Sequence, residues 1–588
     1  MNELLRLGFG RLGYDYDFLT RINRSVYHDK YLFRGEGDIC LKLRALKACG
    51  KRVVVLPDFD MDGISAGCVL FAGLSLFGFP VSLYEPDPSG GYGFRKSDID
   101  AILEQWPDAG MVLTCDVGVA EEFAVAYAKA MGLTVCVTDH HIEKPGKRVD
   151  ADAVMDPCRY DETAPFKGVC GAWVAWHFVQ TYASLSGSDT TRELCRKLVL
   201  FTGLGSCGDL MPMIHDTRAA VSASVLEFNR LLDADDVSAY FGCPADVLPE
   251  AYTAPFENIR ALHYFLIDCG KVRPGDVTDE TYSFTYCPMF NSVRRMGEKM
   301  SGVYSMLYKR HAWNSIERLT LFRWLCDLND GRKALVGELY GKLYGADDQA
   351  LAPYIYLVDA APGVLGLLAA KLMERNGRPC LVLRPDPARK GFSGSGRTMD
   401  WMDAGSMFAV DGVTTDGHEH AFGAFVRQDV LMTLWGRMDA QYLSEHARHD
   451  ACCRSMPDPR PRIYVGKPGM AVPCDFEVSS PDGYDVCMDY AYEIQKFRPF
   501  GNSFREPEFI LMFHGSGVDS ARTMGSDKQH LSLDLGHGVR AVWFGGAGFL
   551  ERLSAGGPDT VYALSGVFGL NEFRGSTSLQ FMVSAEVC

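Results

Sequence analysis

The sequence predicts an α/β protein that begins with a doubly wound parallel sheet and ends with a small β-barrel. Between residues 51 and 139, short apolar runs typical of buried strands alternate with stretches of helical length. This alternation is the pattern of a parallel sheet with helices on both faces. After residue 461, short strand-like runs are separated by Gly-rich turns, as in a small barrel. A chain of 588 residues is also too long for one core, so several domains are expected.

The predicted elements of the parallel sheet follow one another closely. They are strands over 51–56, 81–84, 111–115 and 134–138, with helices over 64–76 and 121–131. The first, third and fourth of these strands run directly into acidic residues. Because ligands bind at the carboxyl ends of strands in such sheets, we expect a functional site there.

Sequence pattern divides the chain into five segments. They are an atypical N-terminal segment (1–50), the α/β domain with the acidic motifs (51–290), a helical linker (291–345), a second α/β domain (346–460) and the barrel (461–588). The Pro-rich run 457–461 (PDPRP) marks the last of these boundaries.

Charge and cysteine content limit the class of protein. The formal net charge of −16 argues against a protein that coats nucleic acid non-specifically. It does not exclude a nuclease, because cations bound to carboxylates reverse the local field. The nineteen cysteines show no paired C-x-x-C spacing, and the N-terminus lacks the profile of a signal peptide. We therefore expect a cytoplasmic protein with reduced thiols.

One uncharged stretch, residues 63–84, is long enough to raise the question of a membrane span. It carries Gly73, Gly78 and Pro80, and it follows directly from an acidic motif. A buried helix followed by a buried strand accounts for it better, so we expect no membrane segment.

The run Asp58-Phe-Asp60-Met-Asp62-Gly63 places three carboxylates at alternate positions. On an extended loop alternate residues point the same way, and converging carboxylates repel one another unless cations neutralise them. Oxygen ligands favour Mg²⁺ or Mn²⁺. An EF-hand calcium loop does not fit, because Val69 stands where the Glu of the twelfth position is needed. Taken alone, the run fits a catalytic metal site and a plain Asp-rich turn about equally well.

Two further motifs favour the metal site. Asp116, in Thr-Cys-Asp-Val-Gly, fits turn chemistry by itself, but it follows another strand of the same sheet. Asp139-His140-His141 directly follows a buried strand, and imidazole together with carboxylates suits Mn²⁺. A carboxylate that bridges two cations about 3.5–4 Å apart would activate a water for in-line attack on phosphorus. The motifs together predict a two-metal phosphoesterase.

In their order along the chain, these motifs resemble the DHH phosphoesterase superfamily. The series D-x-D-x-D-G, D-x-G and D-H-H is followed by Lys167-Gly-Val-Cys-Gly-Ala172 and by Asp209 in Gly-Ser-Cys-Gly-Asp-Leu-Met-Pro. The second α/β domain is similar to the DHH-associated domain of that superfamily. Its Gly394-Ser-Gly-Arg-Thr398 resembles the G-S-G-R-S loop, and Asp416-Gly-His-Glu-His-Ala-Phe-Gly423 resembles G-G-H-x-x-A-A-G. Gly-rich loops of this kind predict a phosphate cradle.

Within the superfamily the chain resembles the RecJ family of single-strand-specific exonucleases from about Lys51 onward. The stretches that carry this resemblance are 288–297 (PMFNSVRRMG), 363–366 (GVLG), 499–509 and 524–533, with Trp543-Phe544. The last two stretches are similar to parts of the oligonucleotide-binding (OB) domain. The sequence departs from the family at Pro88 and Ser89, where an Arg is usual, and at Asp416, where a Gly is usual. Residues 502–505 (NSFR) also replace the usual G-N-P. We expect the DNA contacts, and not the metal site, to have diverged.

The resemblance implies roles for individual residues. The implied metal ligands are Asp60, Asp62, Asp116, His140 and Asp209, with Asp116 as the bridge between two ions of Mn²⁺ or Mg²⁺. Asp58 would support the site as a ligand or from behind the ligands, and His141 would contact the scissile phosphate or assist proton transfer. Ser395, Gly396 and Arg397 would hold the 5′-terminal phosphate, and Arg295 and His418 would hold the neighbouring backbone. In the OB domain, Lys528, His530, Trp543 and Phe544 are candidates for strand contact.

The resemblance implies a 5′→3′ exonuclease that releases 5′-mononucleotides from single-stranded DNA in repair and recombination. Two alternatives stay open. A DHH phosphodiesterase for short oligoribonucleotides or cyclic dinucleotides would not need the barrel. A catalytically silent DHH scaffold in a replication complex should have lost metal carboxylates, and this chain has kept them. The partners expected of a monomeric exonuclease are a single strand with a 5′ end and a helper such as single-strand-binding protein or a helicase.

Overall fold

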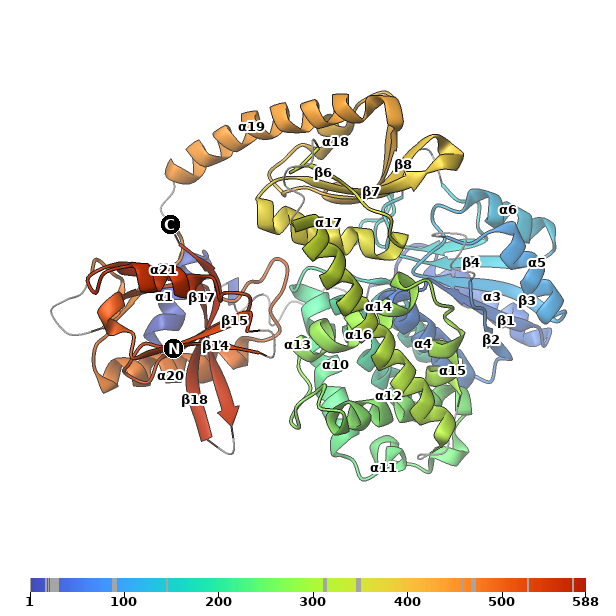
Figure 1. The fold of residues 1–588 in the computed structure, drawn as a ribbon. Helices are drawn as coiled ribbons and strands as arrows, with labels where there is room; N and C mark the ends of the chain where they lie inside the picture. Colours follow the sequence, from blue (N-terminus) through green and yellow to red (C-terminus); the bar gives the residue numbers. More distant parts are fainter. Residues whose placement is uncertain are drawn as a thin grey trace. The chain divides into compact units, whose positions relative to one another are not determined.

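The structure is a computed structural model, and it describes residues 2–587 except 16–17, 20, 22–30, 87–92, 144–145, 147, 310–314, 345–350, 456–457, 467–471, 526–527 and 574–575. The chain forms two compact units (Figure 1). The larger unit contains Val26–Met211 and Ala219–Ser455, and the smaller contains Met1–Ser25, Pro212–Arg218 and Met456–Cys588. The five-segment division of the sequence stays a prediction.

The predicted doubly wound sheet lies in the larger unit. Its strands all run parallel in the order β2-β1-β3-β4-β5. They are β1 (Arg52–Pro57), β2 (Val81–Leu83), β3 (Ala109–Cys115), β4 (Thr134–Thr138) and β5 (Ala153–Met155). The first four agree with the predicted strands. The fifth was not predicted, because three residues are too few to show a periodic pattern.

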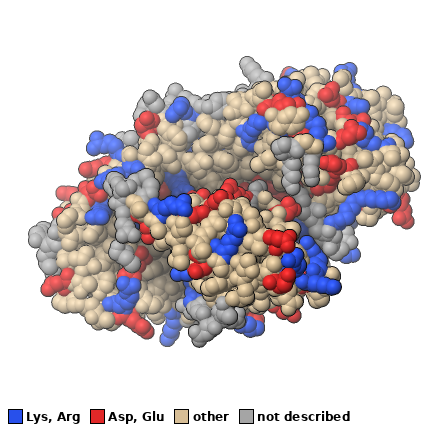
Figure 2. Space-filling model, turned by 90° about the horizontal axis from the view of Figure 1, so that it is seen from above, with Lys and Arg blue, Asp and Glu red and all other residues tan. Residues whose placement is uncertain are grey.

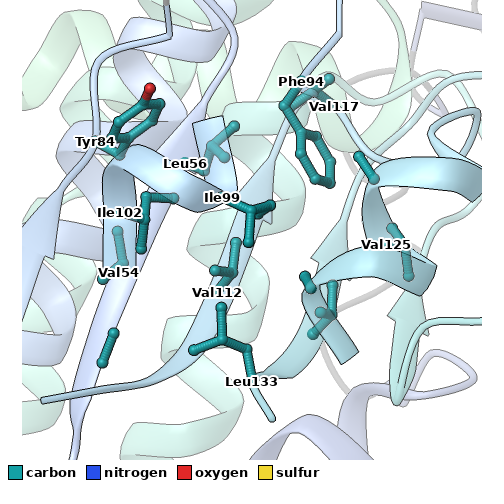
Figure 3. Packing of buried hydrophobic residues seen from close by; sticks show 14 of the residues in the cluster. Val54, Leu56, Tyr84, Phe94, Ile99, Ile102, Val112, Val117, Val125 and Leu133 are labelled. Carbon is teal, nitrogen blue, oxygen red and sulfur yellow. The ribbon is translucent and has the colours of Figure 1, made fainter. Parts of the chain in front are cut away.

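Helices cover both faces of this sheet. On one face, α5 (Lys96–Gln105) and α6 (Glu122–Ala130) pack against Val54 and Val112 through Ile99, Ile102 and Val125 (Figure 3). The connection from β1 to β2 crosses the sheet in the opposite direction to the connections through α5 and α6. Right-handed crossovers therefore place its helix, α4 (Met61–Leu76), on the other face.

The order of the strands also locates the site. It reverses between β1 and β3, because β1 is followed along the chain by β2 on one side and then by β3 on the other. Such a switch point is where open α/β sheets bind ligands, beyond the carboxyl ends of the two strands. The three-Asp run follows β1, and Asp116 follows β3.

The uncharged stretch 63–84 contains the part of helix α4 that follows Asp62, together with strand β2. Fourteen of the sixteen residues of α4 are buried, which explains the absence of charge. Within the described part of the chain, no helix has both the length and the apolar character needed to cross a bilayer.

The rest of the larger unit's first half is helical. Its helices are α3 (Glu36–Ala48), α7 (Gly171–Ser186), α8 (Asp189–Lys197), α9 (Val199–Gly208), α10 (His215–Asp233, whose first residues lie in the smaller unit), α11 (Val237–Phe241), α12 (Glu250–Asp268), α13 (Asp279–Thr281), α14 (Cys287–Arg295), α15 (Ser301–Tyr308) and α16 (Ile316–Tyr344). A π-helical turn over Tyr282–Tyr286 joins α13 to α14. The helical linker predicted over 291–345 is thus occupied by the end of α14, by α15 and by the long helix α16.

The second α/β pattern forms a mixed sheet in the order β6-β7-β8-β10-β9. Its strands are β6 (Ile355–Leu357), β7 (Cys380–Asp386), β8 (Gly391–Arg397), β9 (Val413–His418) and β10 (Ala421–Arg427). One face is covered in part by α17 (Pro362–Asn376), and the other by α18 (Ala404–Phe408) and α19 (Leu431–Ser455).

The two Gly-rich runs of this domain were predicted as loops, and that prediction was wrong. Both lie mostly in antiparallel strands, β8 and the hairpin of β9 with β10. A Cβ at Gly394 would collide with the carbonyl oxygen of Val382 on β7, and a Cβ at Gly396 would collide with the Phe422 ring. These glycines therefore allow close packing of strands and do not mark a turn.

The smaller unit contains an eight-stranded sheet in the order β12-β11-β13-β17-β18-β16-β15-β14. Its elements are α1 (Glu3–Arg11), β11 (Arg462–Val465), β12 (Phe476–Val478), α20 (Pro481–Glu493), β13 (Phe509–His514), β14 (Ser520–Met524), β15 (His530–Asp534), β16 (Arg540–Trp543), α21 (Phe549–Ala555), β17 (Val561–Phe573) and β18 (Ser576–Glu586). Helix α1 packs on α20, where Asn2 donates from its backbone nitrogen to Glu493 at 3.0 Å. The start of the chain thus belongs structurally with its C-terminal domain.

A short inserted segment, Pro212–Arg218, also belongs to this unit. The buried guanidinium of Arg218 donates to the carbonyl oxygens of Phe497 at 2.8 Å and Arg498 at 3.2 Å, and to that of Pro499. Sequence reasoning gave this arginine no role, since its partners are 279–281 residues away.

Candidate metal centre

The three-Asp run turns from strand β1 into helix α4, and each carboxylate has a different environment. Asp60 is the N-cap of α4, where its side chain accepts from the backbone nitrogens of Asp62 at 3.0 Å and Gly63 at 3.1 Å. Asp62 is buried and accepts from the nitrogens of Gly171 at 2.6 Å and Ala172 at 2.9 Å. These donors lie at the N-terminus of α7, whose dipole favours a negative charge there. The fold therefore orients Asp60 and Asp62 through backbone donors.

Asp116 follows β3 in a left-handed conformation, with φ of 63°. Few residues other than glycine adopt it, although Asp and Asn tolerate it best. The side chain is buried, and the backbone nitrogen donates to the carbonyl oxygen of Thr138 at 2.9 Å. A Cβ at Gly171 would lie 2.6 Å from the Cβ of Asp116, so the start of α7 leaves room for this carboxylate.

In the D-H-H motif, the aspartate orients the two histidines. Oδ1 of Asp139 accepts from the backbone nitrogen of His140 at 2.8 Å and lies 2.8 Å from Nδ1 of His141. Its other oxygen accepts from the nitrogen of Val119 at 3.1 Å. Asp139 is therefore engaged by the protein itself, and the ligand groups that the motif offers are the two imidazoles.

His140 brings the motifs together. Its buried Nε2 lies 3.1 Å from Asp116 Oδ1, 3.6 Å from Asp62 Oδ2 and 3.6 Å from Asp209 Oδ2. Possible ligand atoms form three groups, and within each group they all lie within 4.8 Å of one another. The groups are Asp116, His140 and His141; Asp62, His140 and Asp209; and Asp58, Asp60 and Asp116. The structure thus gathers all seven predicted residues of the metal site, and Asp116 and His140 are each shared by two groups.

Burial and mutual repulsion raise the pKa of these carboxyl groups. The pKa of Asp58 is raised by burial and by the charge of Asp60, and that of Asp116 by burial and by the charge of Asp62. The same causes raise the pKa of Asp60, and they raise that of Asp209 to about 8. Carboxylates arranged in this way are stable in their ionised form only beside cations.

The two histidines titrate in opposite directions. Burial lowers the pKa of His140, so this imidazole is neutral at pH 7 and has a lone pair to offer. Burial also opposes the charge on His141, but its hydrogen bond to Asp139 and the charge of Asp139 raise its pKa to about 9. His141 is therefore protonated at neutral pH and can contact an anion.

These observations fit divalent metal ions. The Nε2 atom of His140 makes no hydrogen bond within the described part of the chain, and it points among carboxylate oxygens that repel one another. Oxygen ligands with one or two imidazoles suit Mn²⁺ and Mg²⁺. The side chain of Asp209 is 35% exposed, so the cluster has an open side toward solvent.

Gly205, in the middle of α9, permits this geometry. A Cβ at Gly205 would collide with Oδ1 of Asp62. In an ordinary exposed helix, replacing Gly by Ala stabilises by about 1 kcal/mol. In Gly205→Ala we instead expect the displaced carboxylate to weaken Mn²⁺ binding by about 10- to 100-fold. Calorimetric titration with Mn²⁺ measures this change.

Gly337→Ala is the matched control, because Gly337 lies in the exposed part of α16 with open space around its Cβ position. This control should raise the melting temperature and leave Mn²⁺ affinity unchanged. Equal Mn²⁺ affinity in the two variants would contradict the role given to Gly205.

The predicted phosphate-binding residues of the larger unit also come together. The pKa of Arg295 is lowered by burial and by the nearby charges of Arg332 and Arg397. A Cβ at Gly366 of α17 would lie 3.0 Å from Nη2 of Arg397 and 3.6 Å from Oγ of Ser395. Several guanidinium groups this close form a place for an anion. The side chain of His418, like Pro88 and Ser89, lies outside the described residues.

Besides Gly205, two further residues of this site were missed by sequence reasoning. Arg332 lies in α16, far along the chain from any motif, and only the fold brings it beside Arg295. Asp156 follows the unpredicted strand β5, is fully buried, and has a pKa raised to about 8 by burial and by the charge of Asp139. An acidic residue at the end of a strand was the signal for Asp156, but the strand itself was too short to detect.

The residues predicted to contact a DNA strand lie in the smaller unit. His530 begins β15 and accepts from the nitrogen of Gly545 at 3.1 Å, and the ring of Phe544 lies edge-on to it at 5.1 Å. Phe544 is 64% exposed, whereas Trp543 packs against Phe549 at 5.7 Å. Lys528 is exposed in the turn before β15. Of the two aromatic candidates, Phe544 is thus the better placed to stack on a base.

Family comparisons agree with the fold and the site. Residues 52–201 match the DHH family, N-terminal domain, and residues 480–585 match the RecJ OB domain. The first domain of the chain is therefore a DHH-family domain, and the fold contains a RecJ-type OB domain at its C-terminal end.

Along most of its length the chain is similar to proteins named single-stranded-DNA-specific exonuclease RecJ. It is 23% identical to the protein of Bacillus subtilis, over 95% of this chain and 64% of that protein. It is 24% identical to the protein of Salmonella typhimurium, over 91% of this chain and 87% of that protein. The chain thus spans less than two thirds of the Bacillus subtilis relative.

Solved structures share the fold. The crystal structure of RecJ in complex with Mn²⁺ from Thermus thermophilus matches with a TM-score of 0.70 and 19% identity, over 100% of this chain and 76% of that chain. A structure of exonuclease RecJ bound to manganese matches with a TM-score of 0.52 and 22% identity, over 73% of this chain and 97% of that chain. The predicted fold class is confirmed by these matches together with the DHH and OB domains.

Proposed function

We propose that this protein is a metal-dependent exonuclease that degrades single-stranded DNA from the 5′ end and releases 5′-mononucleotides in DNA repair and recombination. The observation that carries the proposal is the buried group of carboxylates around His140, in a chain that also contains a RecJ-type OB domain. The similarity to proteins named single-stranded-DNA-specific exonuclease supports the choice of substrate.

The proposed ligands of two Mn²⁺ or Mg²⁺ ions are Asp60, Asp62, Asp116, His140 and Asp209. Bound divalent ions would supply a polarised phosphate oxygen and a water of lowered pKa. Asp116 is proposed as the shared ligand, because it belongs to two of the three groups of ligand atoms. Two solved RecJ structures from Thermus thermophilus are in complex with Mn²⁺ and with Mg²⁺, which supports this choice of metals.

The chain's own residues would orient the substrate and move protons. His141 is protonated at neutral pH because of Asp139, so it would donate a hydrogen bond to an oxygen of the scissile phosphate and can supply a proton to the leaving oxygen. A carboxylate oxygen of Asp58 lies within 4.8 Å of those of Asp60 and Asp116, so Asp58 would be a further ligand or would hold the ligand set in place.

The terminal nucleotide would be held by the guanidinium groups beside the metal centre. We propose that Ser395, Gly396 and Arg397 hold the 5′-terminal phosphate, and that Arg295, Arg332 and His418 hold the neighbouring backbone. Guanidinium groups bind phosphate with two directed hydrogen bonds. The contacts to the 5′-terminal phosphate and to the neighbouring backbone would therefore fix the position of the DNA strand relative to the metal centre.

Cleavage polarity tests the proposal directly. A long single-stranded DNA with a 5′-phosphate is labelled at one end or the other and incubated with the full chain and Mn²⁺. We expect early release of a labelled mononucleotide from the 5′ end and no early release from the 3′ end. A duplex of the same sequence should resist cleavage. Degradation confined to short oligoribonucleotides or cyclic dinucleotides would favour the alternative DHH phosphodiesterase, and no cleavage of any substrate would favour the scaffold.

The distribution of charge on the surface suggests that the protein needs help to bind single-stranded DNA. On the face drawn in Figure 2, lysine and arginine side chains are interspersed with acidic ones and form no continuous basic surface. We therefore propose that a partner such as single-strand-binding protein or a helicase helps to deliver the strand. Co-sedimentation with such a partner on single-stranded DNA, compared with DNA alone, tests this proposal.

A further inference from the structure

A cavity of about 620 Å³ lies on the second sheet, beside the first turn of α17. This volume is in the range of small-molecule sites. Helix α17 packs on β7 and on part of β8, and the cavity lies beside its first turn, over the rest of β8 and over β10 and β9. Ser395 lines the cavity and lies beside α17, so the cavity adjoins the residues of β8 that are proposed to bind phosphate.

Strand register defines the floor of the cavity. Ser395 of β8 pairs with Gly423 of β10, which pairs with Asp416 of β9. A Cβ at Gly423 would meet nothing closer than 3.6 Å, so the space between Ser395 and Asp416 is open. In the next row, Phe425 of β10 pairs with Ser393 of β8. Paired residues face the same side of a sheet, so small residues and one aromatic ring form the floor.

The two ends of the cavity carry opposite charge. At one end, where β7 turns into β8, are Arg384 and Arg389, and Asp386 between them accepts from Ser393 Oγ at 2.6 Å and from the Arg389 nitrogen at 3.3 Å. At the other end, Asp416 lies on β9, three strands from β7, which corresponds to about 14 Å at the usual strand spacing. A ligand that fits both ends needs an anionic group and hydrogen-bond donors.

Arg389 also provides a flat surface, because its side chain reaches from the first end of the cavity over Phe425 of β10. Its Cζ lies 3.8 Å from the centre of the Phe425 ring. The ring can therefore hold the guanidinium flat, and a guanidinium plane is a surface on which nucleic acid bases stack. A free phosphate would use neither this plane nor the carboxylate of Asp416.

We propose that this cavity binds a nucleoside 5′-monophosphate, with its base stacked on Arg389, its phosphate toward Arg384 and donor groups of the base or sugar toward Asp416. The proposal rests on the proposed function in one respect, since nucleoside 5′-monophosphates are what end-wise cleavage would release. It also gives a role to Asp416, which stands where the resembling family usually has Gly. The cavity would thus be a site for the released nucleotide, next to the residues that are proposed to hold the 5′-terminal phosphate.

Binding without metal tests this proposal apart from catalysis. The full chain in EDTA is titrated calorimetrically with dAMP, with deoxyribose 5-phosphate, which lacks the base, and with inorganic phosphate. We expect dAMP to bind at least about 10-fold more tightly than the other two ligands, because stacking of one base contributes on that order. Equal affinity for dAMP and deoxyribose 5-phosphate would overturn the proposal.

Arg389→Lys keeps the charge and removes the plane. In this variant we expect dAMP affinity to fall by about 5- to 100-fold, with the affinity for deoxyribose 5-phosphate unchanged. Phe425→Leu removes the ring under the guanidinium while keeping an apolar side chain, and it should also lower dAMP affinity. Arg196→Lys, at an exposed position of α8, is the matched control and should change neither affinity. Unchanged dAMP affinity in both cavity variants would contradict the assignment.

The failures of the two proposals are distinguishable. If dAMP binds as expected in EDTA but single-stranded DNA is not cleaved in Mn²⁺, the cavity is a nucleotide site and the exonuclease proposal is wrong. If cleavage occurs from the 5′ end but dAMP does not bind, the cavity proposal is wrong and the exonuclease proposal stands.

Discussion

Replacing Asp116 with Asn is expected to abolish Mn²⁺-dependent cleavage of single-stranded DNA while leaving the chain folded. Asp116 is buried, lies 3.1 Å from Nε2 of His140, and belongs to two of the three groups of ligand atoms. Asn keeps the shape and tolerates the left-handed backbone at this position, which Ala does not. A lost metal ligand removes several kcal/mol of transition-state stabilisation, so we expect the rate to fall by at least about 1,000-fold.

A control variant and a measurement of the unfolding temperature separate loss of metal binding from loss of folding. Asp100→Asn, on the exposed surface of α5, should leave the cleavage rate unchanged. Because Asn at 116 removes one of several repelling charges, the metal-free variant should unfold at the same temperature as the parent or a higher one. A cleavage rate within about 10-fold of the parent would rule out a two-metal site built on Asp116.

Raising the pH is expected to destabilise the metal-free protein, and Mn²⁺ is expected to reverse the effect. The pKa of Asp209 is raised to about 8 by burial and by the charges of Asp62 and Asp60, whereas an unfolded Asp titrates near 3.9. Between these values the folded chain holds protons that the unfolded chain has released. The free energy of unfolding therefore decreases as the pH rises, and the penalty is complete only above the pKa of the folded state.

Thermal unfolding at pH 5, 6.5 and 8, in EDTA and in Mn²⁺, measures this effect. We expect the increase in melting temperature caused by Mn²⁺ to be smallest at pH 5 and to reach several degrees at pH 8. Asp116→Asn should reduce both the pH dependence and the response to Mn²⁺, because the remaining carboxylates repel one another less. An Mn²⁺ response of the same size at pH 5 and pH 8 would contradict the picture of a charge-strained carboxylate cluster.

Strand β4 and the buried helix α4 show which elements sequence reasoning predicts well. The predicted strand 134–138 coincides with β4, and the predicted helix 64–76 differs from α4 only at its start, because apolar runs of these lengths have one good way to bury themselves. Strand β5 and the strands formed by the Gly-rich runs were not predicted. In β8, glycine allows β7 to approach, and that reason is visible only once the neighbouring strand is in place.

The candidate site divides in the same way. Asp58, Asp60, Asp62, Asp116, His140 and His141 were identified from the sequence, because carboxylates and imidazoles that follow buried parallel strands stand where such sheets bind their ligands. Three residues were not identified: Arg332, Gly205 and Asp156. Gly205 matters because of Asp62, which lies more than a hundred residues away in the sequence, and Arg332 matters because the fold brings it beside Arg295. Asp156 follows a strand that is too short to predict.

The residue types and their order along the chain were enough to predict a parallel α/β domain, a metal centre and a C-terminal barrel, and the resemblance to the RecJ family identified that barrel as an OB domain. This is because metal binding requires particular ligand atoms, and strand periodicity places those atoms at one edge of the sheet. The packing of side chains decided the rest. It established that Asp139 is hydrogen-bonded to Val119, His140 and His141, that the first helix packs on α20, and that the Arg389 guanidinium lies over the Phe425 ring. Such contacts join residues that are distant in sequence, and their geometry exists only in the folded chain.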